Sequence, residues 1–337
     1  MEAVWGPLPT PTPTEISAIE HVGVGDRFFA EGRYDEAIAE YRRATELDPL
    51  LDVAYARWGL VLALRHRRGE ALQMARRAVE INAESAENQA ILGMVLDWDG
   101  QVAEAIAACL KATKIDPNYA LGYAFLAEAY GDYGRVVDAQ ETIKKAMELD
   151  SANPFVRRNL GYVYELLGRY QDAIYEYEAA LDLNPNLAYI YHDLGRNHRA
   201  LGNMEEAAYS FERATQVDPR DPQGYDQLGW TYFAQEMYEM AAAQLEKALE
   251  VDPTYAPAYG HLGLLYYMRR NYEEAIPHLE KAIELGARSE DICYTLGFAY
   301  AYLDQCDRAK PWFEEALELN PGSSVAQQGL AFCQKRE

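Results

Sequence analysis

Cysteine and histidine, the side chains that most often hold metals, are scarce in this sequence and widely scattered. The four cysteines form no Cys-x-x-Cys pair and have no histidines at zinc spacing; they are Cys109, Cys293, Cys306 and Cys333. We therefore expect no metal site and no cofactor. Four thiols in 337 residues also do not make a disulfide scaffold.

Basic residues are also few, with 31 lysines and arginines against 54 acidic residues and a formal net charge of -23. Such a charge opposes binding to nucleic acid and to anionic lipid. No segment approaches the roughly 18 consecutive apolar residues of a spanning helix, so direct membrane insertion is not expected. Residues 1–17 lack the basic start and apolar core of a signal peptide. A cytoplasmic location is the resulting expectation.

No constellation of catalytic residues stands out along the chain. Gly23-Val24-Gly25 lacks the third glycine and the preceding strand of a dinucleotide-binding loop. The run from Asp97 to Gly100 lacks the downstream ligands of a calcium loop. No nucleophile with its base and no phosphate cradle is evident. We predict that these residues carry no catalytic site and that the protein is not an enzyme.

Residues 1–17 differ from the rest because proline alternates with threonine in the stretch WGPLPTPTPTE. A proline-rich segment has few amide donors and little apolar surface to bury, which indicates a disordered tail or linker. Alternating threonine and proline often separates domains. The array that follows could therefore belong to a larger protein, including an enzyme for which it selects substrates.

A 34-residue period runs without insertion or deletion from residue 18 to residue 323. One position is glycine in eight of nine units, with Ala127 as the exception: Gly25, Gly59, Gly93, Gly161, Gly195, Gly229, Gly263 and Gly297. Every unit also has an alanine at the twelfth and at the nineteenth place after this lattice position, as in Ala207 and Ala214. Small residues at fixed intervals indicate places where two helices cross closely.

Within each unit, apolar residues recur every three or four positions and are interrupted near the middle by a turn such as Glu31-Gly32. Proline often closes the unit, as Pro253 does. This pattern resembles the tetratricopeptide repeat family, and it is well shown by Tyr259, Leu262, Gly263, Tyr266, Ala275, Ala282 and the stretch NYEEA at 271–275. Residues 324–337 are similar to one further first helix and are predicted to be a solubilising C-terminal capping helix.

The resemblance implies an all-α fold, a right-handed superhelical solenoid of nine 34-residue helix-turn-helix repeats. At aromatic positions of this repeat stand Cys109, Cys293 and Cys306, which we expect to be buried apolar substitutes. The family's concave groove is lined mainly by first helices, at positions three before and one, four and five after the lattice glycine. Three zones follow from this alignment.

Units one to four place acidic and apolar residues at these groove positions: Asp26, Asp97, Glu128 and Asp132, with Phe29, Leu60, Leu64, Met94 and Trp98. Units five and six place a mainly basic group there: Arg158, Tyr162, His192, Arg196 and Arg199, with Glu165. Units seven to nine place a mainly aromatic group there: Trp230, Phe233, Leu264, Tyr267, Met268, Tyr294, Phe298 and Tyr302, with Asp226.

These zones predict a non-catalytic scaffold that binds a peptide segment or helix of a partner protein in its concave groove. The predicted contacts are Arg158, Tyr162, His192, Arg196, Arg199, Trp230, Phe233, Tyr267, Tyr294, Phe298 and Tyr302. The cations could receive an acidic segment or a free carboxylate, or they could be neutralised by Glu165 or Asp193. The alternative function is a self-assembling structural or spacer module, in which case a homo-oligomer is expected.

Overall fold

The computed structural model describes residues 16–335, which are helical, with no strand in this range. The bounds of the 19 helices are α1 Ala18–Ala30, α2 Tyr34–Leu47, α3 Asp52–Leu64, α4 Arg68–Ile81, α5 Ala86–Trp98, α6 Val102–Ile115, α7 Ala120–Asp132, α8 Val136–Leu149, α9 Pro154–Leu166, α10 Tyr170–Leu183, α11 Ala188–Ala200, α12 Met204–Val217, α13 Pro222–Ala234, α14 Tyr238–Val251, α15 Ala256–Met268, α16 Tyr272–Glu284, α17 Glu290–Tyr302, α18 Cys306–Leu319 and α19 Ser324–Gln334. The linker predicted for residues 1–17 lies outside the described residues as far as residue 15.

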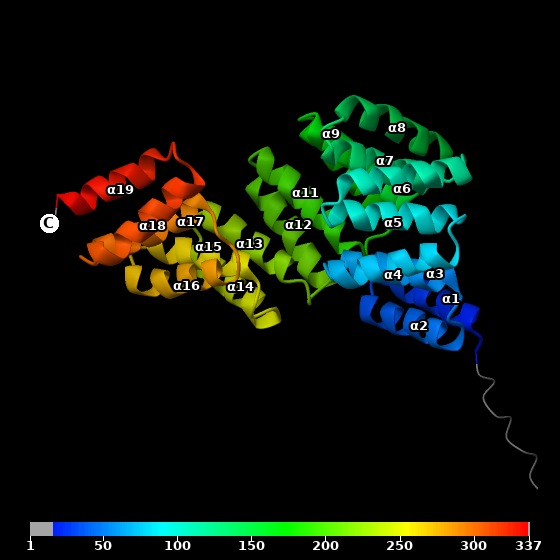
Figure 1. Cartoon of the computed structure of the whole chain (residues 1–337), viewed down its shortest axis with the longest axis horizontal. Helices are drawn as coiled ribbons and strands as arrows, with labels where there is room; N and C mark the ends of the chain where they lie inside the picture. The colour runs from blue at the N-terminus through cyan, green and yellow to red at the C-terminus, as the bar shows by residue number, and fades with distance from the viewer. Residues whose placement is uncertain (1–15, 336–337) are drawn as a thin grey trace, which may run out of the picture. The chain divides into compact units, whose positions relative to one another are not determined.

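The helices form consecutive hairpins in which a first helix packs against the second helix that follows it, from α1–α2 to α7–α8 and from α11–α12 to α17–α18 (Figure 1). First helices recur at close to a 34-residue spacing from Ala18 to Glu290, and second helices do so from Tyr34 to Cys306. The helix spacing matches the period of the sequence. Helix α19 follows in the same period and packs on α17 and α18, in the place expected of a capping helix.

The small residues of the repeat lie at the helix crossings. All nine alanines of the first set, from Ala37 to Ala309, are fully buried. At Gly59 a Cβ atom would stand 3.1 Å from the Ala71 carbonyl oxygen and 3.1 Å from the Ala75 nitrogen. Because backbone atoms cannot move aside as a flexible side chain does, the crossing requires glycine there. The predicted packing reason for the lattice is confirmed at this position.

The turn between the two helices of a hairpin contains one residue with positive φ at the same place in all nine repeats. Glycine holds this place in five repeats, beginning with Gly32, and this accounts for the turn signal in the sequence. The other four repeats place a residue with a side chain in the same left-handed conformation: His66, Glu236, Arg270 and Asp304, with φ of 56°, 61°, 60° and 59°. These four turns carry local strain.

The described chain divides into two compact units. Unit 1 comprises residues 16–169 and 179–186, and unit 2 comprises residues 170–178 and 187–335. Within unit 1, residues far apart in sequence meet. The Tyr34 hydroxyl donates to the Asn186 carbonyl oxygen at 2.6 Å, and the rings of Phe29 and Phe155 stack with centroids 6.5 Å apart. The first hairpin is thereby tied to the last part of the same unit.

Unit 2 ends in a covalent link that the sequence interpretation missed. Cys306 at the start of α18 and Cys333 in α19 form a disulfide, so the prediction of an unpaired apolar substitute at Cys306 is wrong. The repeat alignment compares Cys306 with aromatic residues of other units and does not bring the capping helix next to it. Cys109 and Cys293 are buried free thiols, as predicted.

Candidate binding surfaces on the first helices

In unit 1, the first helices carry ion pairs that run from one repeat to the next. The Arg57 guanidinium on α3 contacts Asp26 on α1, and its Nε donates to Glu87 Oε1 on α5 at 3.1 Å. The Tyr41 hydroxyl donates to Asp26 at 2.8 Å. Burial and the adjacent Asp26 carboxylate raise the pKa of Tyr41, which keeps the hydroxyl protonated as a donor. Three consecutive repeats are linked in this way.

A pocket with a volume of about 240 Å³ lies next to this chain of ion pairs. Its lining comes from α1, α2, α3, α5, α7 and α9 and from the turn before α7, and it consists of Asp26, Phe29, Tyr41, Arg57, Leu60, Glu87, Ile91, Tyr119, Leu121, Phe125 and Phe155. Most of these side chains are apolar, and Asp26, Arg57 and Glu87 are the charged ones. The pocket therefore combines an apolar lining with a charged border.

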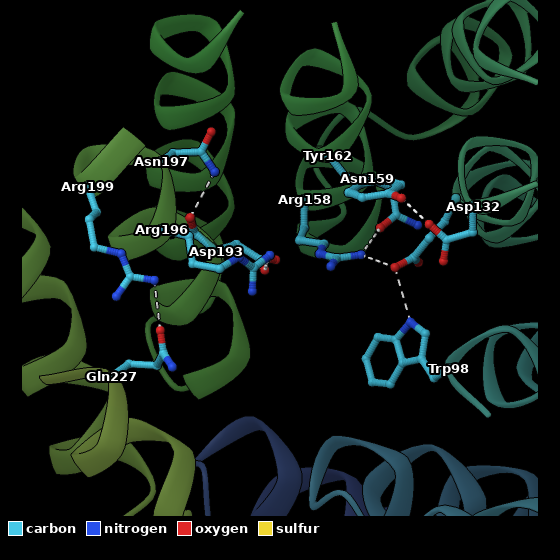
Figure 2. Close-up of polar contacts among 11 residues, drawn as sticks. Trp98, Asp132, Arg158, Asn159, Tyr162, Asp193, Arg196, Asn197, Arg199 and Gln227 are labelled. Atoms are coloured by element: carbon cyan, nitrogen blue, oxygen red, sulfur yellow. Dashed lines mark hydrogen bonds and ion pairs between the residues drawn. The ribbon is translucent and has the colours of Figure 1, made fainter. Parts of the chain in front are cut away.

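A second polar network in unit 1 is centred on Glu128 of α7, and Figure 2 labels its partners Trp98 and Arg158. Arg158 on α9 contacts Glu128 and also donates to Asn159 Oδ1 at 2.9 Å, while the Trp98 indole donates to Glu128 at 3.1 Å. Arg158 is only 8% exposed. Its charge is used to hold Glu128, and it is not displayed on the surface.

Asp97 on α5 is the buried acid beside this network. It is 4% exposed, and among the described residues neither of its carboxyl oxygens meets a donor other than the neighbouring carboxyl group of Asp132. Burial raises the pKa of Asp97 to about 9, with further contributions from the negative charges of Glu128 and Asp132, so the group is neutral at pH 7. Asp132 is exposed and accepts a hydrogen bond from the Tyr162 hydroxyl. The network thus contains more carboxyl groups than Arg158 can compensate.

In unit 2, helix α11 carries the second part of the predicted basic group. His192 is 3% exposed and lies 2.8 Å from Asp221, and Arg196 forms an ion pair with Asp193 at 2.7 Å. Arg199 donates to Gln227 Oε1 at 2.9 Å, and its Nη1, which is buried, meets no acceptor in residues 16–335 (Figure 2). Burial and the neighbouring Arg196 charge lower the pKa of Arg199. Of the two arginines on α11, Arg199 is therefore the one whose charge is less well compensated.

Aromatic side chains extend from α13 to α19 on unit 2. Trp230 stacks on Phe233 at 4.8 Å and on His261 at 4.4 Å between ring centroids. Tyr302 contacts the rings of Tyr267, Tyr272, Phe298 and Phe332 at 5.0 to 6.4 Å. These rings cover much of their own core, yet Tyr302 remains 43% exposed and Met268 remains 60% exposed.

The predicted contact residues are divided between the two units. Arg158 and Tyr162 lie together in unit 1, with the guanidinium 5.4 Å from the ring centroid. The remaining predicted contacts belong to unit 2. Of the two alternatives for the cations, neutralisation by Asp193 is observed for Arg196.

The sequence interpretation missed most of the unit 1 pocket. Arg57, Ile91 and Phe125 stand two places before the lattice position, and Glu87 and Leu121 stand six before it. Positions four apart lie on one side of a helix, so these two columns form a stripe. The two charged members, Arg57 and Glu87, were the signal that could have revealed it.

The described residues contain no group of three potential ligands that could hold a metal ion. In the same part of the chain, no helix is long and apolar enough to cross a membrane.

Comparison with known families decides the relationship that the repeat suggested. Models described as tetratricopeptide repeat match residues 150–220, 256–286, 86–119 and 290–323, and one described as TPR repeat matches residues 25–64 and 229–269. The chain belongs to the tetratricopeptide repeat family. No curated protein matches its sequence.

Solved structures of other proteins share the fold of this tetratricopeptide chain at low identity. The structure of the APC/C hetero-tetramer Cut9-Hcn1 matches with a TM-score of 0.67 and 16% identity, covering 95% of this chain and 78% of that one. Yeast Tom70 matches with a TM-score of 0.52 and 15% identity, covering 94% and 95%. The human IFIT1 dimer with m7Gppp-AAAA matches with a TM-score of 0.58 and 19% identity, covering 86% and 68%. These identities support a shared fold and carry no ligand over to this chain.

Proposed function

We propose that this protein is a non-catalytic scaffold that binds a peptide segment or helix of a partner protein on the first helices of unit 2. The contacts are Arg196, Arg199, Trp230, Phe233, Tyr267, Tyr294, Phe298 and Tyr302. An acidic side chain or free carboxylate of the partner lies at Arg199, while apolar side chains pack on the aromatic residues.

The state of Arg199 carries this proposal. A guanidinium whose side-chain acceptor is the neutral Gln227 and whose neighbour Arg196 is like-charged is stabilised by an incoming carboxylate, because charge-assisted hydrogen bonds are stronger than neutral ones. The exposed parts of Tyr302 and Met268 supply apolar area that a partner would remove from water. Charge and apolar contact together would select a segment of mixed character.

The buried members of the predicted basic group take a supporting role in this proposal. His192 is held by Asp221, and Arg158 is held by Glu128 in unit 1, so both keep their neighbours in position. Tyr162, which hydrogen-bonds Asp132, belongs to the unit 1 surface. A partner would reach Arg196 and Arg199 before either buried cation.

The proposal can be tested by selecting binders from a displayed library of random 12-residue peptides and measuring their dissociation constants by fluorescence anisotropy. Arg199→Gln and Tyr302→Ala should each raise the dissociation constants of the selected acidic peptides about tenfold or more. Arg213→Gln and Tyr209→Ala, on the second helix α12, are matched controls that should leave affinity unchanged. Winners that bind both site variants as well as the parent would place recognition elsewhere. Sedimentation as a dimer that cannot take up peptide would favour self-assembly.

A further inference from the structure

We propose that the first helices of unit 1 form a second binding site, selective for a partner segment that carries an apolar side chain and a basic residue about three positions apart. This proposal rests on the proposed function in one respect, which is that the first helices bind a peptide segment of a partner protein. Its residues and the sign of its charge are different from those of unit 2.

The pocket supplies the place for the apolar side chain. A cavity of roughly 150 Å³ lined by aliphatic and aromatic residues suffices to take up benzene. The unit 1 pocket, with about 240 Å³, has room for a phenylalanine or leucine side chain among Phe29, Leu60, Ile91 and Phe155. Since its lining comes from five consecutive repeats, it exists only when this unit is folded.

The acidic network beside it supplies the place for the basic residue. Arg158 contacts Glu128, whereas Asp132 is exposed and accepts the neutral Tyr162 hydroxyl. Burial and the negative charges of Glu128 and Asp132 raise the pKa of Asp97, which lies almost fully buried next to them. A lysine or arginine of the partner at Asp132 would supply the positive charge that this network lacks.

The distance between the two places follows from the helices that carry both. Phe125 in the pocket and Asp132 are seven residues apart on α7, as are Ile91 in the pocket and Trp98 on α5. Seven residues are two turns of a helix, so each pair lies on one side of its helix with about 10 Å between its members. An extended segment covers about 10 Å in three residues. This fixes the spacing of the two anchoring side chains.

An anion fits this surface poorly. Arg57 is shared by Asp26 and Glu87, and Arg158 is enclosed by Glu128 and Asn159. Both guanidinium groups of the two networks are therefore already compensated, and an incoming carboxylate would meet Asp132 and Glu87. A basic and apolar segment is the occupant that matches both the charge and the pocket.

The test uses the full chain and a displayed library of random 12-residue peptides. We expect one class of selected peptides to carry an apolar residue, Phe or Leu, three positions away from a basic residue, Lys or Arg. Dissociation constants of these synthetic winners are then measured for the parent and two variants. Asp132→Asn should weaken them at least about tenfold through loss of the charge, and Leu60→Phe should weaken them similarly by filling the pocket. Replacing the peptide's basic residue by Gln should remove the effect of Asp132→Asn.

Matched controls separate binding from folding. Glu141→Gln on α8 and Leu110→Phe on α6 make comparable chemical changes at exposed positions of second helices and should leave affinity unchanged. Circular dichroism and the Tm report whether each variant is folded. Absence of the basic and apolar class, or equal affinity for parent and folded Asp132→Asn, would overturn this proposal. Arg199→Gln leaves this site intact, so failure in unit 2 and failure in unit 1 are told apart.

Discussion

Units 1 and 2 are built from the same repeat with the same period, yet they present opposite chemistry on their first helices. In unit 1, both Arg57 and Arg158 are held by carboxylates, and acids remain in excess. In unit 2, Arg199 is held by the neutral Gln227, and Trp230 stacks on Phe233 of its own helix and on His261 of the next first helix. The difference shows that the charge a repeat displays depends on pairing with the neighbouring repeat as well as on its own residues.

The polar pairs between neighbouring repeats have sequence separations that differ from the repeat period. Asp26 and Arg57 are 31 residues apart, Glu128 and Arg158 are 30 apart, and His192 and Asp221 are 29 apart. The repeat itself has a 34-residue period, so neighbouring first helices make these polar contacts about one helical turn out of step. Alignment at the full period finds equivalent positions, whereas the partners in these three pairs are found three to five residues short of it.

The largest predicted effect distinguishes the buried pair of unit 1 from the more exposed pair of unit 2. Arg158→Met should lower the free energy of unfolding by about 3 to 5 kcal/mol, because Glu128 would be left buried and uncompensated. Arg196→Met, whose partner Asp193 is contacted by a more exposed guanidinium, should cost about 1 kcal/mol or less. Urea denaturation measures both. Equal losses would contradict the contrast between the two units.

A smaller effect is expected at the end of unit 2. Cys333→Ser removes the disulfide that joins α18 to α19 across a sequence separation of 27, and should lower stability by about 3 kcal/mol. Local hydrogen exchange should show the loss in α18 and α19, since α19 packs on α17 and α18. A reducing agent should reproduce the loss in the parent and have no effect on the variant. Unchanged exchange in α19 would show that the disulfide does not hold the capping helix.

The neutral buried acid of unit 1 predicts a pH-dependent gain. Because the pKa of Asp97 is raised to about 9 in the folded protein, this group disfavours folding once it ionises in the unfolded chain. Its effect on the free energy of unfolding is therefore smallest below about pH 4, and stability declines as the pH rises from about 4 to about 9. Asp97→Asn removes this decline and should stabilise the fold by about 2 kcal/mol or more at pH 7. The charged groups acting on Asp97 are Glu128 and Asp132 on α7, which raise its pKa, and Arg158 on α9, which lowers it.

Urea titrations of parent and Asp97→Asn at several pH values provide the check. The difference between them should be near zero at pH 4 and grow toward pH 9. A difference independent of pH would mean that Asp97 is ionised in the folded state, and the account of its surroundings would be wrong.

The smallest effect concerns the turns within hairpins, where unit 2 is the more strained. Glu236, Arg270 and Asp304 lie in unit 2 with positive φ, whereas His66 is the one such residue in the described part of unit 1. Replacing Glu236 by glycine should stabilise the fold by about 0.5 to 1 kcal/mol. Gly134→Ala, at the equivalent turn of unit 1, should destabilise it by about as much. Thermal unfolding measures both, and a loss of stability in Glu236→Gly would contradict the strain.

Much of the fold could be predicted from the sequence because the repeat is a packing rule. Gly59 and Ala71 had to be small for two helices to cross, and this constraint is visible at every period. The disulfide could not be predicted in the same way, since Cys306 and Cys333 meet only when the capping helix packs on α18.

The candidate site was harder to predict than the fold. The positions of Arg158 and His192 on first helices were right, but their burial and partners depend on acids that lie about one helical turn short of a full repeat along the chain. An alignment at the full period does not bring those acids together with the cations. Because Arg158 contacts Glu128 in a buried position, replacing Arg158 by glutamate would bring two buried carboxylates together and destabilise the fold.

The most direct test of opposite selectivity measures four dissociation constants with two selected peptides, one acidic and one basic, and two variants of the full chain. Arg199→Gln should weaken the acidic peptide about tenfold or more and leave the basic peptide unaffected, while Asp132→Asn should do the reverse. Both folded variants binding both peptides as tightly as the parent does would contradict the account.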